Sequence, residues 1–146
     1  MMATRAKANE LEHRSFRLPR KLLDAIKRGA ERRGVSQTTL VERYLDEGMR
    51  MDDHPLIVFW DSPLGRRAML AGSRLDVSQV IETIRNSDNS LEDAADYLDL
   101  AELRVRACLS YYAEYQDEVD AYARASAAAS EEAERAWRRE QDLIGA

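Results

Sequence analysis

The amino-acid sequence predicts a mainly α-helical protein in two parts that carry opposite charge. Apolar residues recur at helical spacing through most of the chain, and only two short stretches, around residues 14–18 and 56–72, have the pattern of strands. Residues 1–50 carry 12 Lys and Arg against 7 Asp and Glu, a net charge of +5, whereas residues 51–146 carry 10 against 20, a net charge of -10. The basic part is suited to phosphates, and the acidic part is suited to a different, basic partner.

Composition narrows the classes of function. The longest apolar run in the chain of 146 residues is the five residues Leu56 to Trp60, far short of the roughly 20 that cross a membrane, and no secretory signal begins the sequence. We therefore expect a cytoplasmic protein. One cysteine, Cys108, and two histidines leave little material for a disulfide, a metal site or a histidine-based triad. The sequence predicts neither an enzyme nor a cofactor.

The basic part has the pattern of one strand followed by two helices. Residues 1–12 lack periodicity and predict a disordered leader. Phe16 and Leu18 then alternate with polar residues, and Pro19 ends this strand and favours the start of a helix. Gly34 ends that first helix, and Ser36 is the expected N-cap of the second. The expected apolar positions are Leu22, Leu23, Ile26 and Ala30 on the first helix and Leu40, Val41, Tyr44, Leu45 and Met49 on the second.

A unit of this size cannot be stable alone, because its single strand leaves backbone donors unpaired and its helices bury little apolar area. A symmetric dimer with antiparallel strands solves both problems. This arrangement, with the sequence RSFRLPRKLLDAIKRGAERRGVSQTTLVERYLDEGM, resembles the ribbon-helix-helix family of Arc/MetJ/CopG-type repressors. The resemblance implies a dimeric head over residues 13–51 that binds double-stranded operator DNA.

In that family the outer face of the paired strands enters the major groove of DNA. The resemblance places His13, Ser15 and Arg17 on this face, with Phe16 and Leu18 turned into the dimer core. An arginine there can make a bidentate contact to guanine, so Arg17 is the residue expected to read sequence. The alternative is that an exposed charge on a strand only prevents aggregation.

The start of the second helix is the other expected DNA contact. Backbone N–H groups at Ser36, Gln37 and Thr38, with the positive end of the helix dipole, would hold a backbone phosphate. The same geometry also serves a simple N-cap at Ser36, so the two interpretations remain open.

The acidic part, residues 54–122, predicts a β-hairpin with a five-residue loop, DSPLG, between LIVFW and RRAMLAG. Asp76 with Gln79 predicts one capped helix, and Ser90 predicts the next. A long helix with one apolar face is expected to follow, and the same register continues into the tail. Its expected face is Val105, Cys108, Tyr112, Tyr115, Val119 and Tyr122, continuing through Ser126, Ala129, Ala133 and Ala136.

Residues 54–122 are similar to the domain-of-unknown-function family numbered four hundred and thirty-three, on the sequences HPLIVFWDSPLGRRAMLAG and LEDAADYLDLAELRVRACLSYYAEYQDEVDAY. That resemblance implies the antitoxin of a type II toxin–antitoxin pair, which represses its own operon and neutralises a PIN-like toxin. The alternatives are a stand-alone regulator or a plasmid-partition protein, and, from another class, an enzyme or small-molecule sensor. Oligomers above the homodimer, such as a tetramer on DNA, stay open.

Two features of the acidic part invite other interpretations. A helix-turn-helix-like segment, residues 90–113, carries Arg104 and Arg106, but the acidic residues around it favour a structural role. Tyrosines at helical spacing suit a core better than a platform for stacking bases.

The Ala-rich tail, residues 123–146, has strong helix propensity but few large apolar groups. Burial of those groups cannot offset the ordering entropy of the tail, so we expect it to fray or to order on a partner. The expected anchors are Trp137, Leu143 and Ile144. The alternative is a helix that extends into solvent or pairs with its copy in the dimer.

Overall fold

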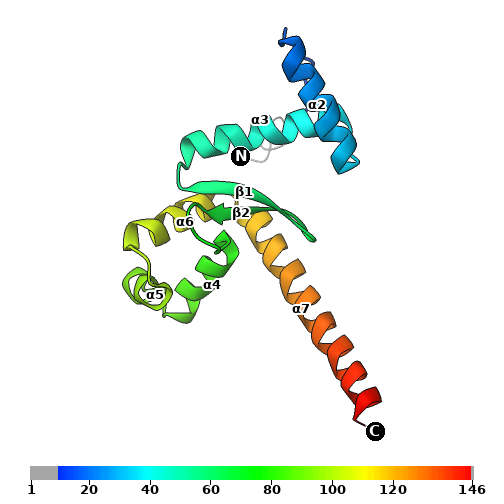
Figure 1. The fold of residues 1–146 in the computed structure, drawn as a ribbon. Helices are drawn as coiled ribbons and strands as arrows, with labels where there is room; N and C mark the ends of the chain where they lie inside the picture. Colours follow the sequence, from blue (N-terminus) through cyan, green and yellow to red (C-terminus); the bar gives the residue numbers. More distant parts are fainter. Residues whose placement is uncertain (1–9, 146) are drawn as a thin grey trace. The chain divides into compact units, whose positions relative to one another are not determined.

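The computed structural model describes residues 10–145 and shows a mainly helical chain with one small antiparallel hairpin, which confirms the predicted fold class at that level (Figure 1). Two compact units, residues 1–44 and 45–146, divide within one helix rather than after it, whereas the sequence suggested a boundary near residue 52. Most of the expected leader lies outside the described residues. The elements are α2 (Arg20–Arg33), α3 (Gln37–Asp53), β1 (Ile57–Ser62), β2 (Gly65–Leu70), α4 (Val77–Asn86), α5 (Leu91–Leu98), α6 (Glu102–Glu114) and α7 (Gln116–Ile144).

Helix α2 begins and ends where the sequence predicts, and α3 begins where it predicts. Pro19 precedes α2, and Gly34 ends it with a φ of 64°, a conformation that glycine adopts without strain. Ser36 caps α3, because its Oγ accepts a hydrogen bond of 3.0 Å from the N–H of Thr39. A Cβ added to Gly29 would lie 3.1 Å from Cδ2 of Leu40, so the glycine permits close contact between α2 and α3.

The expected strand through Phe16 and Leu18 is not formed in the single chain. Residues 10–19 have no regular secondary structure, and among the described residues the only sheet pairs β1 with β2. A strand needs a neighbour to satisfy its backbone groups, and one chain supplies none here. The two apolar side chains are correspondingly exposed, by 77% at Phe16 and 39% at Leu18. The ribbon-helix-helix arrangement therefore remains a prediction about two chains.

The predicted hairpin is confirmed, but its loop is shorter than expected. Ser62 pairs with Gly65, which leaves a two-residue loop in place of the five residues predicted. The Ser62 hydroxyl donates a 2.8 Å hydrogen bond to the carbonyl oxygen of Gly65 and accepts one of 3.2 Å from the N–H of Leu64. These side-chain bonds stabilise the turn, and the strands therefore stay paired up to Ser62 and Gly65.

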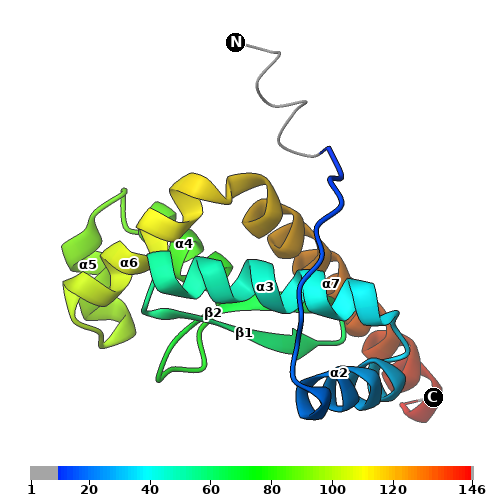
Figure 2. The same cartoon turned by 90° about the horizontal axis from the view of Figure 1, so that it is seen from above.

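In the core of the second unit α4 and α6 pack against the hairpin and α5 packs against α4 and α6, and these helices group together in both views (Figure 1 and Figure 2). Asp76 and Gln79 form the predicted capping box at α4, and Ser90 caps α5 by accepting from the N–H of Asp93 at 3.1 Å. The fully or nearly buried residues include Ile57, Leu70, Val77, Val80, Ile81, Ile84, Ala94, Ala95, Val105, Cys108, Tyr111, Tyr112 and Val119.

The prediction of one continuous helix through the face from Val105 to Tyr122 is wrong, because the chain breaks at Tyr115. There φ is -119° and ψ is 36°, and the N–H of Tyr115 still bonds the carbonyl oxygen of Tyr111 at 3.1 Å. The break gives α6 and α7 different directions. Both helices pack on α4, but α6 also packs on α5 and β1, whereas α7 also packs on β2. Tyr111 and Tyr112 are buried, which supports their interpretation as core residues.

The tail predicted to fray is helical as far as Ile144. Its C-terminal half extends past the rest of the second unit (Figure 1). The side chains of residues 127–145 are exposed, apart from Ala136. This part of α7 therefore has little packing from its own chain.

Candidate nucleic-acid interface

The first unit carries the excess positive charge of the protein. Residues 1–44 hold 11 Lys and Arg against 5 Asp and Glu, a net charge of +6, and residues 45–146 hold 11 against 22, a net charge of -11. All three lysines lie in the first unit, two of them, Lys21 and Lys27, on α2. The division by structure thus sharpens the division seen in the sequence.

The three residues expected to read base edges are exposed, but in the single chain they lie on no strand and so share no sheet face. His13, Ser15 and Arg17 all lie in the irregular segment before α2. Their neighbour Arg14 forms an exposed ion pair with Glu12 at 2.7 Å. The single chain leaves these side chains accessible, and the predicted alternation of faces depends on a second strand.

The N-terminus of α3 has the features that a phosphate contact requires. Ser36, Gln37 and Thr38 are exposed, and the first turn of the helix contains no acidic residue. The Ser36 hydroxyl is engaged as an N-cap and also donates a 2.8 Å hydrogen bond to Oγ1 of Thr39. The sequence did not indicate the role of Thr39, because Thr38 and Thr39 both lie close enough to Ser36 to take part in the cap.

The first unit exposes much of its apolar surface. Of its hydrophobic residues only Ala30 and Leu40 are buried among those described. The large apolar side chains left exposed in this unit include Phe16, Leu18, Leu22, Leu23 and Tyr44. Proteins rarely leave so much apolar surface of a small unit exposed to water, so these side chains are suited to contact with another protein surface.

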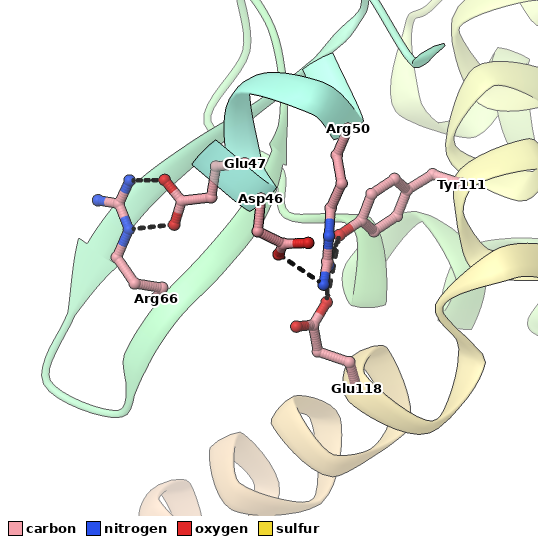
Figure 3. A network of polar contacts seen from close by, with 6 residues as sticks. All are labelled: Asp46, Glu47, Arg50, Arg66, Tyr111 and Glu118. Carbon is pink, nitrogen blue, oxygen red and sulfur yellow. Dashed lines mark hydrogen bonds and ion pairs between the residues drawn. The ribbon is translucent and has the colours of Figure 1, made fainter. Parts of the chain in front are cut away.

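An arginine network fixes the C-terminal half of α3 within the second unit (Figure 3). Arg50 Nη1 donates to the Tyr111 hydroxyl at 2.9 Å and to Glu118 Oε2 at 2.6 Å, and Nη2 lies 2.9 Å from Asp46 Oδ2. The Arg50 guanidinium also stacks 4.0 Å from the ring centroid of Tyr115. Sequence patterns did not indicate this network, because its bonded partners lie up to 68 residues apart.

Two further polar contacts hold the same region. Arg66 on β2 makes a bidentate pair with Glu47 on α3, with N–O distances of 2.8 and 2.6 Å (Figure 3). His54, in the turn after α3, is buried, with Nε2 3.3 Å from Glu114 Oε1 and its ring edge-on to Tyr111. These contacts set the direction of the chain from α3 into the hairpin.

The environment shifts the pKa of several groups in this region. Burial alone would lower the pKa of Arg50, but its hydrogen bonds to Tyr111 and Glu118 raise the pKa above the usual arginine range. Burial raises the pKa of Tyr111, and it raises the pKa of the Cys108 thiol to about 12. Arg50 thus stays charged, and Cys108 stays a neutral thiol that does not act as a nucleophile at ordinary pH.

The arginines of the helix-turn-helix-like segment have structural partners. Arg104 donates to the carbonyl oxygen of Ala71 after the hairpin, and Arg106 pairs with Glu102 at 2.7 Å on the same helix. Acidic residues surround both helices of this segment. Both arginines therefore have partners within the second unit, which favours the structural role expected for this segment.

The expected partner anchors lie on the exposed half of α7. Trp137 is 59% exposed, Leu143 82% and Ile144 77%.

Within residues 10–145 no group of three or more metal-ligating side chains gathers, and no helix in that range has the length and apolar character needed to cross a membrane.

Comparison with models of known families, with curated proteins and with solved structures finds no match for this chain.

Proposed function

We propose that the protein is a homodimeric DNA-binding repressor whose first unit binds operator DNA. One observation carries the proposal: a unit of net charge +6 leaves several large apolar side chains exposed, including Phe16 and Leu18. A second copy would cover this apolar face and would give the segment before α2 the strand partner it lacks. The positive charge would then surround a two-stranded ribbon.

In this proposal the ribbon recognises the base sequence, and the helix N-termini fix the position of the protein on the DNA backbone. Arg17, His13 and Ser15 would point from the ribbon into the major groove, with Arg17 able to bind guanine through two hydrogen bonds. The N-termini of the two α3 helices would hold phosphates on either side, through Ser36 and Gln37. A two-fold symmetric protein requires a palindromic operator.

The second unit extends the proposal to a protein partner. Its net charge of -11 opposes contact with DNA and suits a basic surface. We propose that this partner is a toxin encoded with the protein, neutralised by the second unit, as the resemblance of residues 54–122 implies. Co-purification of the natively expressed protein tests this extension: a nuclease-like partner supports it, and a partition ATPase or no partner favours the alternatives.

The DNA-binding proposal is tested by selecting binding sequences from random DNA with the full chain and with the Arg17→Ala variant. The variant should keep its fold, because Arg17 is exposed and unpacked, but should lose about tenfold in affinity and relax its preference at one position per half-site. Arg106→Ala, an exposed change in the second unit, is the control and should bind as the unchanged protein does. Equal binding by the Arg17→Ala variant would contradict the assigned ribbon face.

A further inference from the structure

We draw no further inference here: the strongest candidate, the cleft between the hairpin loop and the middle of α7, carries none because nothing in residues 10–145 shows what covers its lining of mainly small residues.

Discussion

Arg50 and Tyr111, 61 residues apart, share a hydrogen bond of 2.9 Å that ties the end of α3 to α6. The side chain of Arg50 is only 15% exposed, and Tyr111 is fully buried. A buried hydroxyl and a buried cation each require partners, and each supplies one for the other. Glu118 and Asp46 then balance the charge at the edge of the unit.

Replacement of Arg50 should therefore destabilise the second unit. Arg50→Met keeps most of the side-chain volume but removes the hydrogen bonds and the stacking on Tyr115, and should lower the free energy of unfolding by about 2–3 kcal/mol. Chemical denaturation measures the change. Arg106→Met removes only an exposed pair within one helix and should alter the free energy by less than about 0.5 kcal/mol. Equal losses in the two variants would contradict a special role for Arg50.

Local features of the fold were predictable because the sequence encodes them within a few residues. Gly34, Ser36, Asp76 and Ser90 act at helix ends through bonds to groups no more than four or five positions away. The same holds for the apolar faces of α4 and α5. Sequence patterns therefore identify the helices and most of their ends.

Features that depend on distant packing were not predictable. Tyr115 breaks the helix without a glycine or proline. The break lets both helices pack on α4 while α6 also contacts β1 and α7 also contacts β2, and these contacts join residues far apart in the sequence. The hairpin loop is short because Ser62 bonds within the turn, and serine is common in loops of many lengths. The strand expected through Phe16 is not formed in the single chain, and in the proposed dimer it would need the strand of a second copy.

The buried thiol of Cys108 gives the protein a distinct dependence on pH. Burial raises its pKa to about 12, whereas the unfolded chain loses this proton near pH 9. Between those values the native state holds a proton that the unfolded state releases, so stability falls as pH rises. The slope approaches about 1.4 kcal/mol per pH unit for one group.

Denaturation at pH 9 and pH 10 should reveal this effect when the unchanged protein is compared with Cys108→Ala, because the ionisation of tyrosines and lysines is common to both proteins. The unchanged protein should lose about 1 kcal/mol more than Cys108→Ala over that interval. Cys108→Ala lowers stability at every pH by opening a small cavity, so the comparison concerns the slope and not the absolute value. Parallel slopes would show that the thiol gains no protection from burial.

The lysines of α2 should contribute to DNA binding in a different way from Arg17. Lys21 and Lys27 are exposed and lie in the first unit, where their charge attracts phosphates without reading bases. Lys21→Ala with Lys27→Ala should weaken binding to operator and unrelated DNA by similar factors.

Measurement of the dissociation constant over a range of salt concentrations separates these roles. Each lysine that neutralises one phosphate adds about 0.9 to the slope of log affinity against log salt, so the double variant should have a shallower slope. Arg17→Ala should instead reduce the ratio of operator to unrelated binding, because in the proposed complex its guanidinium would read a base. If the lysine variants reduced only operator binding, α2 would lie closer to the base edges than the proposed ribbon allows.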